Sequence, residues 1–338
     1  MSLSRSRFSV IPVLLVLIVL KSAMDLYLAG SLTVESSLPF IPSGRHGQQN
    51  PNTVPVGIPR SLRTMNSTGG VVFFYHMQKT GGITVRIAAK RQGKQRVKFI
   101  RPKPFLENFL LISEKIQWYL RNTTIPAPRP VLFVEHHGGG QSIFDMEPHF
   151  KLWREASRST GIPLFIFTLL RDPVSLAISH FNFFHVPPGT PPFDHPLYEA
   201  TEENLRLISK PEHQLRMLAH GGEGNRSLHV DFDDALEVRT LDVLHKYFSW
   251  VGATEQLSQV TLPLLGWIML GDTGALTNFK AKNVGAKRRG VAQLEKDNMT
   301  SETLSYLESI NQRTSRIWQQ EAWYTPTQKL DSRIQLFH

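Results

Sequence analysis

Cysteine is missing from all 338 residues of the chain, and acidic residues are scarce. Without cysteine there are no disulfide bonds, no thiolate nucleophile and no cysteine-ligated zinc site. Asp and Glu number 28 against 38 Lys and Arg, which leaves a formal net charge of +10. This excess favours a polyanionic partner, such as nucleic acid, an acidic membrane or an acidic polysaccharide. Metal-ligand spacing is also missing, so no metal site is expected.

The N-terminal apolar run is short. It covers Phe8–Leu20, 13 residues, whereas roughly 20 span a typical bilayer. Arg5 and Arg7 precede it. Two interpretations remain: a cleaved signal peptide, or an uncleaved signal anchor whose N-terminus lies in the cytosol. We favour the anchor, with residues 1–7 as the cytosolic tail and residues 8–28 as the transmembrane segment.

Residues 29–68 are rich in Ser, Pro, Gly, Asn and Gln, which is typical of a flexible stem. Residues 69–338 are then the predicted folded domain. The chain also has four glycosylation triplets, which agree with a lumenal domain that follows a membrane anchor. Lumenal placement argues against a nucleic-acid partner. The acceptor residues are Asn66, Asn122, Asn225 and Asn298.

Short apolar segments alternate with amphipathic segments from Val71 onward, which predicts an α/β fold with a mainly parallel sheet. Continuous apolar runs are expected of strands that are covered on both faces. A helix is expected to begin near Pro173, with Asp172 as its N-cap. The predicted strands are residues 71–76, 131–135, 163–170 and 250–253, and the earlier predicted helices are residues 82–91 and 105–120.

The first predicted strand leads directly into His76-Met-Gln-Lys-Thr-Gly-Gly-Ile-Thr84. Its glycines let backbone N–H groups turn toward an anion, and the following helix contributes its positive N-terminal end. Lys79 adds a full charge. The usual nucleotide-triphosphate loop has the order G-x-x-x-x-G-K-[ST]. Because lysine precedes the glycines here, the loop predicts a phosphate site that differs from that of a typical kinase.

A second anion-binding signal is the segment Arg-Asp-Pro-Val-Ser that begins at Arg171. A basic residue at the carboxyl end of a buried strand lies where α/β sheets bind ligands. Ser175 and Ser179 are four residues apart and share a helix face. The Arg171 guanidinium can bind a phosphate through two hydrogen bonds, while the Ser179 hydroxyl donates a hydrogen bond to the same phosphate. The alternative is an Arg–Asp ion pair beside a helix cap, which the presence of both loops makes less favoured.

Two phosphate sites on one sheet indicate a nucleotide with phosphates at both ends of its ribose. Both motifs resemble those of sulfotransferases that use 3′-phosphoadenosine 5′-phosphosulfate, and are closer still to the Golgi heparan sulfate 2-O- and 6-O-sulfotransferases. The resemblance covers roughly residues 70–320 and is sharp only in the two loops. It implies a P-loop-like three-layer sandwich and a single-pass type II Golgi membrane glycoprotein with a lumenal sulfotransferase domain.

The same resemblance implies sulfuryl transfer, without a metal, to a sugar hydroxyl of an acidic glycan, such as the glycosaminoglycan heparan sulfate. Lys79 would steady the bridging oxygen as the sulfuryl group leaves, because a fixed cation beside a departing phosphate lowers the barrier. Arg171 and Ser179 would bind the 3′-phosphate. The 5′-phosphosulfate loop would consist of Gln78, Lys79, Thr80, Gly81, Gly82, Ile83 and Thr84.

The acceptor hydroxyl needs a base, and Glu135-His136-His137 places three proton acceptors at the end of a predicted strand. Related glycosaminoglycan enzymes often have a His-x-His pattern there, so the register of this sequence is open. A base on the second residue of that pair would be His137. An imidazole suits hydroxyl activation because its pKa lies near neutrality. We therefore expect His137 to be the base and keep His136 in reserve.

Two basic stretches have alternative interpretations. In the first, residues 280–290, Lys287 and Arg288 would close over the 3′-phosphate, as basic loops do in the family that the chain resembles. The second, residues 90–103, contains no Asp or Glu and could bind an acidic polysaccharide. Each stretch could equally be a solvated surface.

Two rival functions also remain. A P-loop kinase would bind ATP and require magnesium, and a catalytically silent glycan-binding protein would bind heparin-like chains without turnover. The sequence leaves a homo-oligomeric state open.

Overall fold

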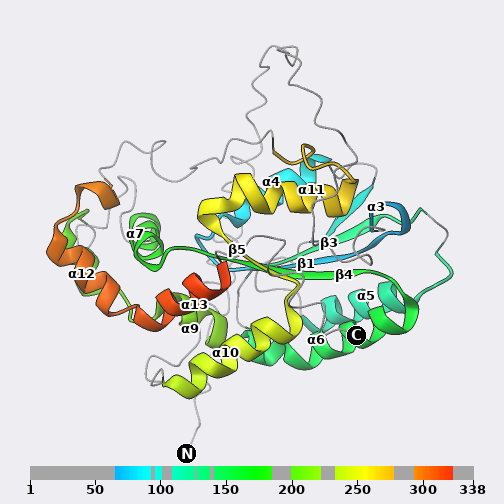
Figure 1. Ribbon diagram of the computed structural model, residues 1–338, viewed down its shortest axis with the longest axis horizontal. Helices are drawn as coiled ribbons and strands as arrows, with labels where there is room; N and C mark the ends of the chain where they lie inside the picture. Colours follow the sequence, from blue (N-terminus) through cyan, green and yellow to red (C-terminus); the bar gives the residue numbers. More distant parts are fainter. Residues whose placement is uncertain are drawn as a thin grey trace, which may run out of the picture. The chain divides into compact units, whose positions relative to one another are not determined.

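A five-stranded β-sheet lies at the centre of the computed structural model, with strand order β2-β3-β1-β4-β5 and every neighbouring pair parallel (Figure 1). The structure describes residues 65–92, 96–100, 109–125, 128–137, 141–184, 199–221, 233–277 and 293–322. All of them belong to one unit, residues 51–338. The strands are β1 (Gly70–His76), β2 (Val97–Ile100), β3 (Val131–His137), β4 (Leu164–Leu170) and β5 (Trp250–Ala253).

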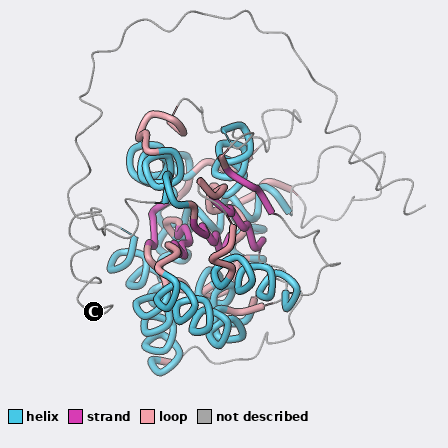
Figure 2. Tube along the Cα trace, turned by 90° about the vertical axis from the view of Figure 1, so that its right-hand side faces the viewer, coloured by secondary structure: helices cyan, strands magenta, loops and turns pink. Residues whose placement is uncertain are grey.

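Helices cover both faces of the sheet, so the chain has the predicted α/β fold in a three-layer arrangement (Figure 2). One face packs against α3 (Met65–Thr68), α4 (Gly82–Gln92) and α11 (Leu262–Leu270). The other packs against α5 (Phe109–Arg121), α6 (Ile143–Thr160) and α10 (Asp234–Tyr247). The remaining elements are α7 (Pro173–Phe184), α8 (Glu202–Ile208), α9 (His213–His220), η2 (Thr254–Gln256), η3 (Leu257–Thr261), η4 (Lys296–Asn298), α12 (Ser301–Ser309) and α13 (Gln312–Ala322).

The apolar runs of the sequence form the central strands because both of their faces are buried. Every residue of β1 and of β4 is buried. The predicted strand at residues 131–135 is longer in the structure, since β3 continues through His137. Burial of uninterrupted apolar segments on both sides is the usual arrangement of parallel sheets.

Local signals in the sequence set the ends of α6. Ser142 and Asp145 form a capping box, in which the Ser142 hydroxyl accepts from the Asp145 N–H and the Asp145 carboxylate accepts from the Ser142 N–H. The helix ends at Gly161, whose φ of 72° is left-handed. These caps fix where the chain leaves β3 and where it returns toward β4.

The chain leaves β1 and β3 toward opposite faces of the sheet. Val85 of α4 packs on the face that contains Phe74, whereas Phe150 of α6 packs on the face that contains Phe73. Adjacent parallel strands whose connections diverge in this way form a topological switch point, and ligands of open α/β sheets bind beside the carboxyl ends of such strands. In this chain the switch point lies at His76 and His137, which are partners in the register of β1 and β3.

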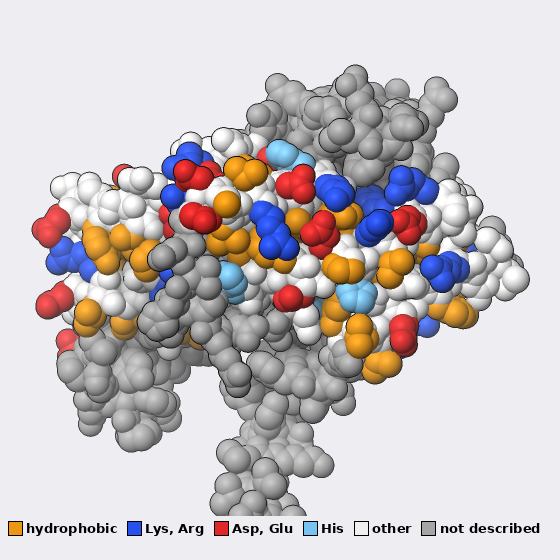
Figure 3. Space-filling model, turned by 90° about the horizontal axis from the view of Figure 1, so that it is seen from below, with side chains coloured by type: hydrophobic (Ala, Val, Ile, Leu, Met, Phe, Trp, Pro, Cys, Tyr) orange, Lys and Arg blue, Asp and Glu red, His pale blue; other side chains and the backbone are white. Residues whose placement is uncertain are grey.

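The face formed by α5, α6 and α10 carries a mixed surface (Figure 3). Basic, acidic and apolar side chains are interspersed there. On α5, Leu110, Leu111 and Trp118 are exposed. No large area of one charge gathers on the part of this face that is drawn in colour. The mixed charge makes it a poor candidate for binding a polyanion.

The predicted stem overlaps the folded unit at its end. Met65–Thr68 form α3, and Met65 is fully buried against α11. A Cβ atom at Gly70 would lie 2.8 Å from the Met65 side chain, which shows how closely α3 covers β1. The proposed tail and anchor, residues 1–28, and most of the stem lie outside the described residues. Among the helices that are described, none combines the length and the hydropathy needed to cross a bilayer.

We expect Met65→Ala to lower the free energy of unfolding by about 2–5 kcal/mol, because it leaves a cavity under α11. The matched control is Leu111→Ala, at a side chain that is 50% exposed, which should change stability by less than about 0.5 kcal/mol. Urea denaturation of both variants measures the difference. Equal, small effects would mean that α3 is not part of the cooperative unit.

Candidate functional site

The loop between β1 and α4 has an unusual backbone. Lys79 has a φ of 62° and Gly81 a φ of 81°, both left-handed. Glycine adopts this conformation without strain, whereas for lysine it costs roughly 1–2 kcal/mol. The Thr80 hydroxyl holds the turn by donating to the carbonyl oxygen of Met77 at 2.9 Å. Strain of this kind in a non-glycine residue is often found at functional sites.

The two predicted anion loops meet at the same edge of the sheet. The Arg171 Nη1 group donates to the Lys79 carbonyl oxygen at 3.1 Å. They meet because β1 and β4 are parallel neighbours, so that their carboxyl ends lie together. The sequence predicted two separate loops, and the tertiary structure joins them by a direct hydrogen bond.

Neighbouring elements hold both loops in place. The Gln214 amide of α9 accepts from the Arg171 backbone N–H at 2.9 Å and donates to the Arg171 carbonyl oxygen at 3.0 Å. The Thr254 hydroxyl, at the end of β5, lies 3.0 Å from the carbonyl oxygens of both Thr80 and Leu170. Side chains from α9 and η2 therefore fix the backbone of the candidate site.

Arg171 is a half-buried cation next to two carboxylates. Burial lowers the pKa of its guanidinium, and the nearby Glu255 and Asp172 oppose this effect. Asp172 caps α7 by accepting from the Ser175 N–H at 2.8 Å, as the sequence predicted, and pairs with Lys296 at 2.9 Å. Within the described residues no ion pair joins Asp172 to Arg171, which argues against the simple Arg–Asp interpretation.

The Lys79 ammonium lies over an aromatic ring. Its nitrogen is 3.9 Å from the centre of the Phe183 ring, at the end of α7. Phe183 and its neighbour Phe184 are 40% and 39% exposed. A cation–π contact at an exposed site stabilises by about 0.5–1 kcal/mol, little enough for an anionic ligand to displace the ammonium.

The other predicted ligand residues have varied surroundings. Gln78 is half-buried, and its side-chain oxygen is buried without a hydrogen-bond partner in the described part of the chain. Thr80 is fully buried, whereas Ile83 is 39% exposed. Ser179 is half-buried on α7, two turns beyond Arg171. Gly81 directly precedes α4, whereas Gly82 and Thr84 lie in its first turn. Lys287 and Arg288 lie outside the described residues.

A buried His–Glu pair, which no motif of the sequence predicted, lies beside the loop. The His76 Nδ1 atom is 2.8 Å from Glu135 Oε1, and Arg86 Nη1 is 4.0 Å from the same oxygen. The rings of His76 and His137 meet edge to face at 4.5 Å. A polar residue at the end of an otherwise apolar strand is the signal that could have pointed to His76.

His136 and His137 lie on opposite faces of the sheet, as alternating strand residues do. His136 packs against Phe73 and Phe109 with ring centres 6.3 and 5.2 Å apart, and is only 5% exposed. Burial lowers its pKa from 6.5 to about 4. His137 is half-buried on the face of His76. The geometry therefore favours His137 over His136 as a base.

The predicted glycosylation residues differ in exposure. Asn298 is exposed in the η4 turn, whereas Asn66 and Asn122 are half-buried. The Asn122 side-chain oxygen accepts from the Thr124 N–H and hydroxyl at 3.1 and 2.6 Å. Asn225 lies outside the described residues. Asn298 is the most accessible acceptor among those that the structure describes.

Comparisons with known proteins identify no family for this chain. No protein-family model matches the chain, and no curated protein matches it. Across the described residues, no group of three or more His, Cys, Asp or Glu side chains is arranged to hold a metal ion.

We expect Gly82→Ala to destabilise the protein by about 1–3 kcal/mol through overpacking. A Cβ atom at position 82 would lie 1.9 Å from His76 Nε2, so the imidazole fills the space under the first residue of α4. His76→Ala should relieve this clash. In a double-mutant cycle measured by chemical denaturation, the double variant should therefore be more stable than additivity predicts. Additive effects would show that His76 does not restrict this position.

We expect the buried His136 to make the protein less stable in mild acid. Between pH 6.5 and about 4 the unfolded chain binds a proton at this histidine that the folded chain does not bind. Stability therefore falls as pH falls through that window, by about 3 kcal/mol at pH 4. His136→Phe should remove this share of the pH dependence. Urea denaturation at several pH values tests it, and parallel profiles for both proteins would contradict the assignment.

Proposed function

We propose that this protein transfers a sulfuryl group from 3′-phosphoadenosine 5′-phosphosulfate to a hydroxyl of an acidic glycan. The observation that carries the proposal is the hydrogen bond between Arg171 and the Lys79 carbonyl. It brings two anion-binding motifs to one edge of a parallel sheet, where a nucleotide with phosphates at both ends of its ribose can contact both. A parallel sheet with helices on both faces agrees with the P-loop-like sandwich that the resemblance implies.

The residues around the first loop suit a phosphosulfate. The first N–H groups of α4 lack intrahelical acceptors and carry the positive end of the helix dipole. The Gln78 side-chain oxygen is buried without a hydrogen-bond partner within the described part of the chain, so it can accept from a donor group of the ligand. Position 82 has no side chain, and the His76 imidazole fills the space where one would lie. The backbone at Gly82 can therefore approach an anion closely.

The proposed reaction is an in-line displacement at sulfur. The acceptor oxygen forms a bond to sulfur as the bond from sulfur to the bridging phosphate oxygen breaks, and the hydroxyl proton passes to His137. The products are the sulfated sugar and adenosine 3′,5′-bisphosphate. Lys79 stabilises the negative charge that develops on the departing phosphate. This requires the ammonium to leave the Phe183 ring, over which it lies in the structure.

Arg171 and Ser179 are assigned to the 3′-phosphate. A guanidinium remains charged even when burial lowers its pKa, so the half-buried Arg171 keeps its positive charge at neutral pH. Lys287 and Arg288 are proposed to add charge at the same phosphate. The net charge of +10 agrees with an acidic acceptor such as heparan sulfate. We place the domain in the Golgi lumen, anchored by residues 8–28.

We expect Lys79→Ala, Arg171→Ala and His137→Ala each to reduce transfer of labelled sulfate to desulfated heparan sulfate by at least about 100-fold. Lys115→Ala is the matched control, since this lysine is exposed on α5, outside the site. Arg171→Lys keeps the charge but loses the planar fork, and should recover only part of the activity. Full activity in all three alanine variants would refute the proposed site.

The same assays separate the rival functions. Magnesium-dependent phosphoryl transfer from ATP would identify a kinase. Heparin binding without turnover, and without a rise in melting temperature on addition of adenosine 3′,5′-bisphosphate, would identify a silent glycan-binding protein.

A further inference from the structure

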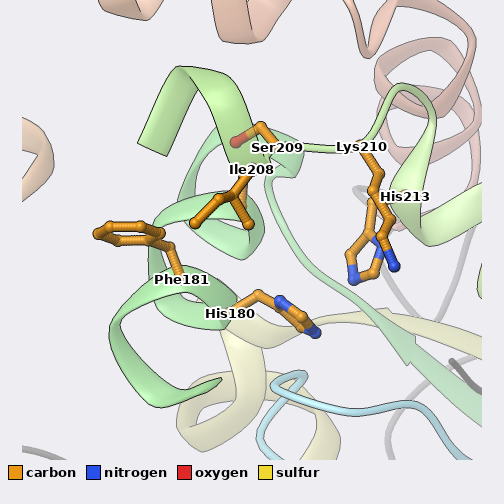
Figure 4. Close-up of a pocket in the computed structure, with 7 residues that line it drawn as sticks. His180, Phe181, Ile208, Ser209, Lys210 and His213 are labelled. Atoms are coloured by element: carbon orange, nitrogen blue, oxygen red, sulfur yellow. The ribbon is translucent and has the colours of Figure 1, made fainter. Parts of the chain in front are cut away.

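A pocket lies along α7 (Figure 4). It is formed by α7 and by the segment that connects α8 to α9, and its cavity of about 20 Å³ opens to the surface. Four of its lining residues have polar side chains and three are apolar. The polar residues are His180, Ser209, Lys210 and His213, and the apolar residues are Ala177, Phe181 and Ile208.

The polar residues of this pocket bring hydrogen-bond donors together. His180 and His213 are each 7% exposed, and their rings meet edge to face at 4.5 Å. Lys210 lines the same pocket as His213 (Figure 4). The Ser209 hydroxyl oxygen is buried and has no partner in the part of the chain that the structure describes. Imidazole, ammonium and hydroxyl groups can all donate to an anion.

None of the described residues that line the pocket carries a carboxylate. Glu212 is the nearest acidic residue in the sequence, and its carboxylate is held by the start of α13. It accepts from the Thr314 N–H at 2.7 Å, from the Thr314 hydroxyl at 2.6 Å and from the Arg313 N–H at 3.0 Å. The described lining therefore places the Lys210 ammonium, the Ser209 hydroxyl and two imidazoles around one cavity, which suits an oxyanion.

Aromatic rings connect this pocket to the Lys79 loop. The Lys79 ammonium lies over Phe183, the Phe183 and Phe184 rings are 4.8 Å apart, and the Phe184 and His180 rings are 4.5 Å apart. Both phenylalanines are partly exposed. From Pro173 to His180, α7 rises about 10 Å. A polymer that reaches the loop can therefore extend over these rings to the pocket.

We infer that this pocket is an acceptor subsite, which binds a carboxylate or sulfate group of the acidic glycan while a neighbouring sugar lies at the Lys79 loop. The inference rests on the proposed function and adds to it a source of acceptor specificity. The charged group of the glycan enters between His180, His213 and Lys210. The sugar rings between the two sites pack on Phe183 and Phe184, which offer apolar faces.

Steady-state kinetics of the full-length protein test this subsite, with heparan sulfate and its carboxyl-reduced, desulfated form as acceptors. Lys210→Ala should raise the KM for the charged acceptor by about tenfold or more, as loss of a charge-assisted hydrogen bond does. The KM for the neutral acceptor and for the donor should not change. Lys210→Arg should restore much of the affinity, and Ser209→Ala should give a smaller effect in the same direction.

Lys151→Ala, at an exposed lysine of α6, is the matched control and should leave every constant unchanged. Melting temperatures of all variants check folding. An unchanged KM in Lys210→Ala, or an equal rise for charged and neutral acceptors, would overturn the subsite.

Direct binding separates this inference from the proposed function. If the protein transfers no sulfate but Lys210→Ala still weakens binding of heparin oligosaccharides in calorimetry, the transferase assignment fails and the glycan subsite stands. If Lys210→Ala abolishes stabilisation by inorganic sulfate yet binds oligosaccharides normally, the pocket is a site for free anions, and the inference fails.

Discussion

The hydrogen bond from the Arg171 guanidinium to the Lys79 carbonyl is the interaction on which the candidate site depends. It exists only because β1 and β4 are parallel neighbours and because Lys79 adopts a left-handed backbone conformation. That conformation costs roughly 1–2 kcal/mol. A hydrogen bond from a charged donor contributes about 1.5–3 kcal/mol, which can offset the strain. The Gln214 amide and the Thr254 hydroxyl then hold the backbone on either side.

The opposite side of the loop depends on a second buried contact. The His76–Glu135 pair lies under α4, and its imidazole fills the space that a side chain at Gly82 would need. The His76 imidazole also contacts the ring of His137, the half-buried residue at the end of β3. One cluster thus supports both the loop after β1 and the proposed base. The same strand sends His136 to the other face, into an aromatic core.

The parts of the site that the sequence predicted are those with local signals. Apolar runs located β1 and β4, and the Asp172 cap located the start of α7, because burial and capping depend on residues adjacent in the chain. Met65 was instead placed in the stem, since one buried side chain in a polar segment has no periodicity to reveal it. His76 was missed for a related reason: its partner Glu135 is 59 residues away.

By itself the sequence determined the α/β class and the positions, after strands, of the two motifs that are predicted to bind anions, because these signals lie within a few adjacent residues. Only the tertiary structure decided that Lys79 and Arg171 lie together, that His136 and His137 face apart, and that His180 and His213 share a pocket with Lys210. Strand order and helix packing set those distances, and both arise from burial of residues that are remote in the chain.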